Sequence, residues 1–575
     1  MCVKHKPEGN YCEWYALFEN GRNDILIITL YCDESQRRKR YEKKRTEFAS
    51  DSGYTDRHID RLWKFGGGNA TDAGQSVPAA AIDPNKIAVV AMGDYLVQDW
   101  DPAISYGVDP RVLCNVYETL LTSNPDGTYN NVLATECEGS EDGLTWTFKL
   151  RENVKFQDGT DFNADAVKYA IDRTIAMDKG GAYIWGPVKE IKVIDDYTVE
   201  FSLNYPVDLR EIVSCQYAAF IYAPSAGEDL EESSAWFYEC NMCGTGPYTL
   251  QEFSSGSHLI LKKFDDYWKG WEGNHIEQIV FKSAEESTTR RQMIEGGEAD
   301  LAFDIVASDA EAMADNANLS IEVTETEKNL QCFLNVEAGP FTDKKVRQAI
   351  AYSFPYQDVI DYVQYGKYAT LPVDVIAPAT LIGVTESIPY TYDMDKAKAL
   401  LEEAGMAEGF EITASYHNID EDTKKVLELW KSELAKLNVT LNIETNSWEV
   451  VYNKAKSSNP EERDDIFVAK TFADTNTSYG PYSTCVESGA GWNFSGIKNP
   501  EYDEKIEAAY QAAAFEQKEY ITQMQEVGAE IADDCFQMNL YDFSQITAVS
   551  NNFHGFTMNP AYQGAVPFYD CYKGN

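Results

Sequence analysis

Strand patterns and helix patterns follow one another along this chain from about residue 86 onward. Apolar and polar residues alternate at 144–150 and again at 199–203, which is the period of a half-buried strand. Residues 161–176 instead place their apolar side chains on one face of a helix. Strands and helices mixed in this order predict α/β lobes.

The second half of the chain shows the same mixture with clear helix ends. Asp393 is a typical N-cap residue for a helix that ends before Gly405, a typical C-cap residue. A helix predicted around residues 424–437 leads directly into a strand pattern at 439–443. Because 575 residues are too many for one hydrophobic core, we expect these elements to form two or more lobes.

The chain is strongly acidic, with a formal net charge of -45 at pH 7. Residues 1–65 are slightly basic, so the acidity lies in the remainder of the chain. A body of this charge repels nucleic acid and anionic membrane surfaces, and no run of about 18 apolar residues predicts a membrane-spanning helix. The charge suits a soluble monomer, although a general acidic bias of the source organism would explain it equally well.

Motifs for catalysis, metal binding and phosphate binding are missing from the sequence. It contains no HExxH, no GxSxG and no GxxxxGK[ST], so we predict no catalytic residues, no metal site and no cofactor. Cys240 and Cys243 form a lone CxxC without a second ligand pair. Nine of the 12 cysteines lie beyond residue 100, and an odd number cannot all pair, so we expect structural thiols or one local disulfide.

Short sequence signatures recur at intervals from residue 116 to residue 503. Each is weak alone, and none is catalytic, but their order and spacing are specific. They are Val116–Leu121, Asp142–Arg151, Val154–Thr160, Gly244–Tyr248, Phe264–Gly270, Pro340–Ala349, Tyr392–Gly405 and Trp492–Asp503.

This ordered set resembles the family 5 extracellular solute-binding proteins of ABC transporters, the oligopeptide, dipeptide and nickel-binding type. The resemblance covers roughly residues 86 to 575 and implies a two-lobed periplasmic-binding-protein-like fold of type II. By the resemblance, lobe one spans 86–334 together with a C-terminal return at 546–575, and an extra subdomain lies at about 118–243. Lobe two spans 335–545.

The resemblance places a ligand site at residues 469–478, directly after a buried-strand pattern. In peptide-binding members an aspartate of this segment pairs with the peptide's free α-amino group, and Asp474 matches it. Phe472 and Asn476 lie beside it. Thr471 stands where those members have tryptophan, and the usual proline is absent. The alternative interpretation of Asp474 is an Asx-turn residue after a strand.

A second wall of the site is implied at Ser105, Tyr106 and Gly107, the stretch that lends main-chain groups to the ligand in peptide binders. An ordinary loop would explain the same residues. Trp492 and Asn493 are placed so that they could close the cleft from lobe two, although Trp492 fits a core position equally well.

The resemblance implies a substrate-binding component of an ABC import system that captures short peptides by closure of two lobes and delivers them to membrane permease subunits. No enzyme activity is expected. One alternative is the same fold with a non-peptide solute, such as an oligosaccharide, a nickel chelate or an opine. A second alternative is a hydrolase, which would need a nucleophile or a carboxylate pair in the cleft.

Residues 1–64 do not fit the family pattern. They contain a basic run at 37–45, which is typical of a solvated helix face or a disordered tract. Residues 65–85 form a Gly/Ala/Ser/Pro-rich flexible linker that resembles the tether of a surface lipoprotein, but Phe65 stands where the lipidated cysteine is expected. We expect an extracytoplasmic location and hypothesise that residues 1–64 replace a signal peptide.

Overall fold

The computed structural model describes residues 3–7, 12–20, 24–32, 82–93, 96–107, 109–385, 388–560, 562 and 565–574. Contacts within the chain divide it into two compact units, Met1–Ala81 and Ile82–Asn575. The basic run at 37–45 and the linker up to residue 81 lie outside the described residues.

The first unit contains one antiparallel sheet of three strands. These are β1 (Val3–Pro7), β2 (Cys12–Asn20) and β3 (Asp24–Cys32), paired in the order β1-β2-β3.

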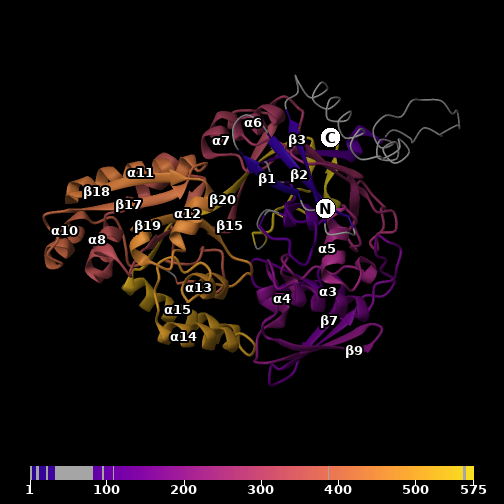
Figure 1. Cartoon of the computed structure of the whole chain (residues 1–575). Coiled ribbons are helices and arrows are strands. Elements are labelled where there is room, and N and C mark those ends of the chain that lie inside the picture. Colours follow the sequence, from indigo (N-terminus) through magenta and orange to yellow (C-terminus); the bar gives the residue numbers. More distant parts are fainter. Residues whose placement is uncertain are drawn as a thin grey trace. The chain divides into compact units, whose positions relative to one another are not determined.

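The second unit is built around one mixed sheet of 11 strands (Figure 1). Its strands pair in the order β11-β12-β13-β4-β14-β20-β15-β19-β17-β18, and β16 pairs with β20. Their bounds are β4 (Ile87–Met92), β11 (Tyr248–Ser254), β12 (His258–Lys263), β13 (Gln278–Ser283), β14 (Leu301–Ala302), β15 (Leu319–Leu334), β16 (Ala369–Thr370), β17 (Phe410–His417), β18 (Val439–Asn446), β19 (Ile466–Phe472) and β20 (Gln537–Ser550).

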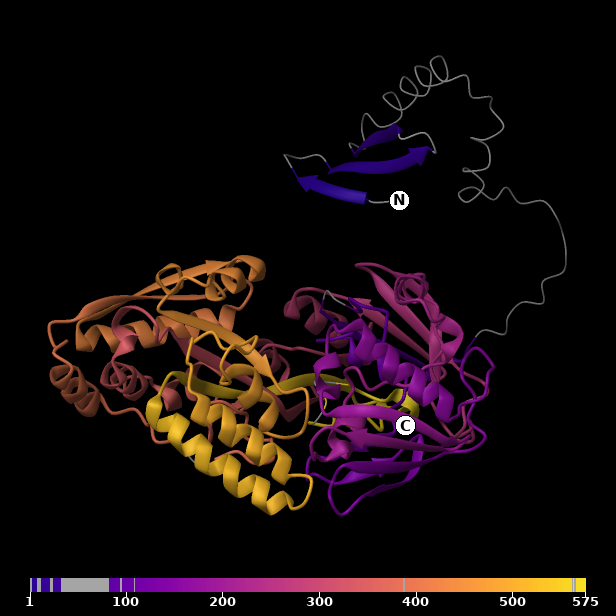
Figure 2. The same cartoon turned by 60° about the horizontal axis from the view of Figure 1, so that its bottom comes forward.

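The two long strands β15 and β20 connect the two halves of this unit, as Figures 1 and 2 show. They pair antiparallel from Leu319 opposite Ser550 to Phe333 opposite Gln537. The register shifts between Glu325 and Asn329, so the intervening residues of β15 form an irregular step in the ladder.

Apolar side chains gather on both sides of this connection. A first core is built mainly from residues between 88 and 303 and is completed by residues 549–571. Residues between 330 and 541 form two adjoining clusters, which we call together the second core. The C-terminal segment therefore returns to the first core. The lobe boundaries given above stay predictions.

A separate four-stranded sheet packs within the first core, in the order β7-β8-β10-β9. Both strand patterns of the sequence are confirmed here, as β8 (Thr145–Leu150) and β10 (Thr198–Leu203). The predicted helix is α3 (Ala164–Met177), and it begins after Asn163 because that side chain accepts a hydrogen bond from the Ala166 N–H. The outer strands are β7 (Ala134–Gly139) and β9 (Val188–Asp195).

The helices and the strand that the sequence predicts in the second half of the chain are also confirmed. Asp393 caps α10 (Met394–Glu403) by accepting a hydrogen bond from the Lys396 N–H. The next helix, α11 (Glu421–Leu434), starts slightly earlier than predicted because Asp420 caps it, and the chain then enters β18.

Further helices and strands complete the unit. The remaining α-helices are α2 (Pro110–Leu113), α4 (Leu209–Ser214), α5 (Leu230–Tyr238), α6 (Ser287–Glu295), α7 (Ala307–Met313), α8 (Lys344–Tyr352), α9 (Tyr356–Asp358), α12 (Trp448–Ala455), α13 (Tyr479–Cys485), α14 (Pro500–Ala512) and α15 (Gln517–Asp534). The remaining strands are β5 (Leu121–Ser123), β6 (Tyr129–Asn131), β21 (Phe553–His554) and β22 (Tyr572–Lys573).

The glycine-rich signature at Gly244–Tyr248 has a packing role. A Cβ atom at Gly244 would lie 2.0 Å from the carbonyl oxygen of Val116, so only glycine fits where these two backbones meet. The cysteines from Cys114 onward are free thiols, and Cys240 and Cys243 are among them. In the part of the chain that the structure describes, no helix combines the length and the apolar character needed to cross a membrane.

Candidate functional site

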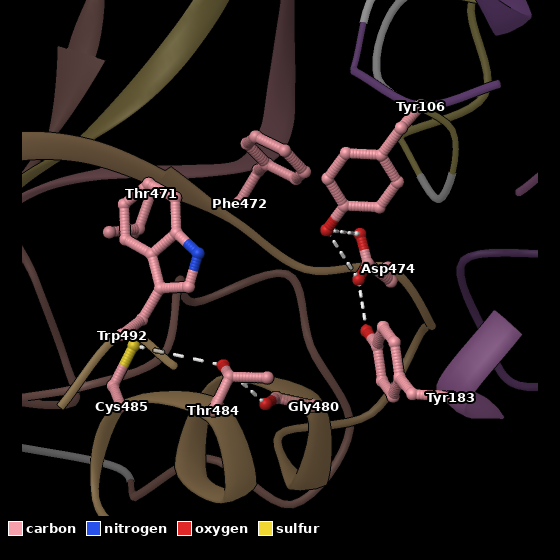
Figure 3. A pocket seen from close by; sticks show the side chains of 9 residues that line it. All are labelled: Tyr106, Tyr183, Thr471, Phe472, Asp474, Gly480, Thr484, Cys485 and Trp492. Atoms are coloured by element: carbon pink, nitrogen blue, oxygen red, sulfur yellow. Dashed lines mark hydrogen bonds between the residues drawn. The ribbon is translucent and has the colours of Figure 1, made fainter. Parts of the chain in front are cut away.

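A small pocket opens beyond the carboxyl end of β19 (Figure 3). The strand ends at Phe472, and the chain then turns through Asp474 into α13. The pocket therefore lies where ligands of open α/β lobes bind. Its lining residues are Tyr106, Tyr183, Thr471, Phe472, Asp474, Gly480, Thr484, Cys485 and Trp492.

The polar centre of the pocket is the carboxylate of Asp474. The hydroxyl of Tyr106 donates to both carboxylate oxygens, at 3.0 and 2.8 Å, and the hydroxyl of Tyr183 donates to Oδ2 (Figure 3). Tyr106 packs against the first core, and Tyr183 lies in a 3₁₀ turn at Ala182–Trp185 whose neighbours Ile184 and Trp185 belong to that core. Asp474 follows Ala473 of the second core. These hydrogen bonds therefore join the first half of the unit, which contains the first core, to the second half, which contains the second core.

Removal from water dominates the electrostatics of Asp474. Burial raises the pKa of this carboxyl to about 6, although the hydrogen bonds from Tyr183 and Tyr106 oppose the rise. Burial and the neighbouring Asp474 charge raise the pKa of both tyrosines well above the ordinary value, so both hydroxyls remain protonated donors. The pocket thus presents a partly desolvated negative charge at neutral pH.

Aromatic rings form the walls around this charge. The ring centroid of Tyr106 lies 5.7 Å from that of Phe472 and 4.9 Å from that of Tyr217. On another side of the pocket, Trp492 packs on Trp448 with ring centroids 6.0 Å apart. Rigid rings beside a carboxylate suit a ligand with a cationic group and apolar parts.

Four of the predicted site residues are brought together in this pocket: Asp474, Phe472, Tyr106 and Trp492. The other four lie outside its lining. The buried Ser105 donates its N–H to the Asp101 carbonyl at 2.9 Å, and the Gly107 carbonyl accepts the Tyr217 hydroxyl at 3.1 Å. Both main-chain groups are thus engaged within the first half, and their contact with a ligand stays a prediction.

The two remaining predicted residues hold loops. The amide of Asn476 donates to the Asn124 carbonyl at 2.8 Å, which ties the segment after β19 to the first half. The amide of Asn493 donates to the carbonyls of Val486, Glu487 and Ile497. Direct ligand contact by either residue stays a prediction.

Sequence reasoning missed Tyr183 and Tyr217, which complete the polar centre and the aromatic wall. Neither lies in a signature, and their only signal is the high aromatic content of the chain, 13%. It also missed Cys215, whose thiol lies 3.1 Å from the Asp474 carbonyl oxygen. Within the described residues, no group of three or more His, Cys, Asp or Glu side chains is arranged to hold a metal ion.

Comparison with known proteins assigns the family. The profile of the bacterial extracellular solute-binding proteins, family 5 (middle region), matches residues 128–493. The chain therefore belongs to the family 5 extracellular solute-binding proteins. This agrees with the two-lobed α/β architecture and with a pocket between the two cores.

Curated relatives include the glutathione-binding protein GsiB of Salmonella typhimurium, 32% identical over 331 residues, and GsiB of Escherichia coli K12, 31% identical over 332 residues. Each match covers 57% of this chain and 63% of the relative, so the chain spans less than two thirds of the curated relatives' length.

Solved structures share the fold over most of the chain. The periplasmic binding protein DppA of Helicobacter pylori, in complex with the peptide STSA, is 22% identical with a TM-score of 0.72 and covers 85% of this chain and 98% of its own. NikA of Brucella suis, in complex with Fe(III)-EDTA, is 22% identical with a TM-score of 0.74 and covers 84% of this chain and 100% of its own. The fold is therefore that of two-lobed periplasmic binding proteins.

Proposed function

We propose that this protein captures short peptides outside the cytoplasm and delivers them to the membrane subunits of an ABC importer. The observation that carries the proposal is the carboxylate of Asp474, which is desolvated, held by two tyrosine hydroxyls and not paired with any cationic side chain of the described residues. A free α-ammonium group is the chemical partner that such a carboxylate lacks.

Binding by closure of two lobes is part of the proposal. Tyr106 and Tyr183 belong to the first half, Asp474 belongs to the second, and a ligand held by all three would be enclosed between them. No bond of the ligand needs to break, because the gain comes from charge pairing and from desolvation of the aromatic walls. We propose lobe boundaries at 86–334 with 546–575, and at 335–545, and a monomer in solution.

The relatives support a peptide ligand without fixing it. GsiB is named for glutathione, and one structural neighbour is the dipeptide-binding protein of Pseudoalteromonas sp. SM9913 in complex with Met-Leu. Thr471, which lines the pocket, replaces the tryptophan of the peptide-binding pattern and leaves more room beside Asp474. A non-peptide solute is therefore the second candidate.

Two measurements test this proposal. Native mass spectrometry of the purified protein identifies any small molecule that co-purifies with it. Calorimetric titration then compares a dipeptide such as Ala-Leu with its N-acetylated form. We expect the acetylated peptide to bind much more weakly, because acetylation removes the charge that Asp474 would neutralise. Equal affinity for the two forms would overturn the amino-terminal anchor and favour a non-peptide solute.

A further inference from the structure

Three carboxylates, those of Asp474, Glu211 and Glu327, meet at the short segment from Ala473 to Thr477. The Ala473 N–H donates to the carbonyl of Glu327 at 3.1 Å, so Glu327 lies directly beside the turn that carries Asp474. From the first half, Glu211 accepts the hydroxyl of Thr477 at 2.6 Å. One acidic side chain of α4, one of β15 and one of the turn after β19 thus meet at the junction of the two halves.

The carboxyl group of Glu327 has neither a hydrogen-bond donor nor an ionic partner among the described residues. Glu327 is only 1% exposed, and neither of its carboxyl oxygens accepts a hydrogen bond. Burial, with repulsion from Glu211 and then from Asp474, raises its pKa well above the ordinary value. Burial likewise raises the pKa of Glu211 to about 7, although the hydroxyls of Thr475 and Thr477 oppose the rise. Among the described residues, no lysine, arginine or histidine forms an ion pair with Glu327, Glu211 or Asp474.

The cationic side chains of Arg111 and Lys328 act on another carboxylate, that of Asp304. Arg111 pairs with Asp304, with Nη2 and Oδ1 2.9 Å apart. Lys328 follows Glu327 directly on β15, and its charge interacts with Arg111, Asp304 and Lys470 and not with the three carboxylates. The protein therefore supplies positive charge next to Asp304 and leaves Glu327 uncompensated.

A buried charged carboxylate without a partner costs more free energy than one that is paired and hydrogen-bonded. The α-ammonium of a peptide would offset the charge of Asp474 and leave the other two carboxylates unpaired. Glu327 also interacts electrostatically with Cys215, Tyr217 and Tyr562 of the first half.

We propose that Glu327 and Glu211 form a second cation subsite beside Asp474, and that the preferred solute is a short peptide with a lysine or arginine side chain. The inference rests on the proposed function, because it takes the α-ammonium as the group bound by Asp474. It assigns Glu327 as the specificity-determining residue for the second positive charge.

Matched dipeptides test this subsite. Calorimetry at pH 7 would compare Lys-Ala with norleucyl-alanine and Ala-Lys with alanyl-norleucine, because norleucine keeps the carbon chain and lacks the ammonium. We expect the lysine peptide of at least one pair to bind about tenfold or more tightly. Glu327→Gln should remove most of that preference while retaining the binding of the norleucine peptide.

Two further variants make the result decisive. Glu325→Gln removes the same charge from an exposed position of the same strand, so it should leave the lysine preference unchanged. Glu211→Gln should reduce the preference and replaces Glu327→Gln if that variant does not fold. Equal affinity within both pairs of peptides, or a lysine preference that survives both glutamine variants, would overturn this inference alone. No binding of any of the four peptides would overturn the proposed function and this inference with it.

Discussion

The hydroxyl of Tyr106 donates hydrogen bonds to both carboxylate oxygens of Asp474, although 368 residues separate the two along the chain. One residue packs against the first core and the other follows a strand of the second. This contact joins the two halves, so a change at either end tests both the pocket and the proposed closure.

Asp474→Asn should keep the fold and lose ligand affinity. Asparagine retains the size and hydrogen bonding of the side chain but cannot neutralise an ammonium group in a desolvated pocket. We expect a loss of roughly 2 kcal/mol or more in binding free energy, measured by calorimetry with one peptide known to bind. An Asx-turn residue would tolerate asparagine, so unchanged affinity would remove Asp474 from the site.

Tyr106→Phe should weaken peptide binding while leaving stability nearly unchanged. The ring would keep its packing on Phe472 and Tyr217, but Asp474 would lose a donor that stabilises its charged form. We expect a loss of roughly 1–2 kcal/mol in binding free energy. Tyr368→Phe removes a hydroxyl that donates to Glu311 at 2.8 Å, away from the pocket, and serves as the control. An equal effect of both variants on affinity would contradict the assignment.

Peptide affinity should fall as the pH is lowered through about 6. The pKa of Asp474 is raised to about 6, so the carboxylate that binds an ammonium is charged at pH 7 and mostly protonated at pH 5. The slope should approach about tenfold per pH unit at low pH. The effect on stability runs the other way. Burial raises the pKa of Asp474 in the ligand-free folded protein above its value of 3.8 in the unfolded chain, so protonation of Asp474 stabilises that folded state. This stabilisation is lost as the pH rises through about 6, whereas peptide affinity increases.

Calorimetry from pH 5 to pH 8 would measure this dependence. Glu211 also titrates in this window, since its pKa is raised to about 7. The Asp474→Asn variant therefore serves as the reference, because it should lose the component of the slope that Asp474 contributes. A slope identical in the two proteins would contradict the assignment.

Arg173→Met should destabilise the first core strongly. Its guanidinium donates to both oxygens of Asp101 at 2.7 Å, and the two side chains are 2% and 0% exposed. Loss of the arginine leaves a buried carboxylate without its counter-ion, which costs about 3–5 kcal/mol. Lys168→Met breaks an exposed ion pair of the same helix with Asp172 and should cost no more than about 0.5 kcal/mol. Urea denaturation of both variants compares the two free energies of unfolding.

Deletion of residues 1–80 should leave folding and ligand binding of the remainder intact. The compact unit that contains the pocket begins at Ile82, and both of its cores are built from residues beyond 87. Thermal unfolding and calorimetry of the shortened chain would measure both properties. A large fall in the melting temperature would show that the first unit supports the second.

The elements of the fold were predictable where local signals were strong. The strand patterns around Trp146 and Phe201 have the period of two that burial on one face imposes, and Asp393 carries its own capping chemistry. The pairing of β15 with β20 was not predictable from local patterns, because the partners are separated by more than 200 residues and no local rule selects among 11 strands.

The residues of the candidate site likewise divide into those with a local signal in the sequence and those without one. Asp474 could be proposed from its place after a strand and from the family pattern. Tyr183 could not, since it lies in an isolated 3₁₀ turn 291 residues away from the carboxylate that it contacts. Glu327 could not either, because one glutamate among 94 acidic residues gives no signal until its burial and its missing partners are known.

The irregular step in β15 has a mechanical meaning. Between Glu325 and Asn329 the ladder with β20 shifts register, so the backbone there can twist with fewer sheet hydrogen bonds at stake than elsewhere in the connection. Glu327 and Lys328 lie within this step. The interruption in the ladder that connects the two halves therefore coincides with a buried carboxyl group that has no hydrogen-bond partner, so a cation bound to Glu327 would act on the backbone that joins the lobes.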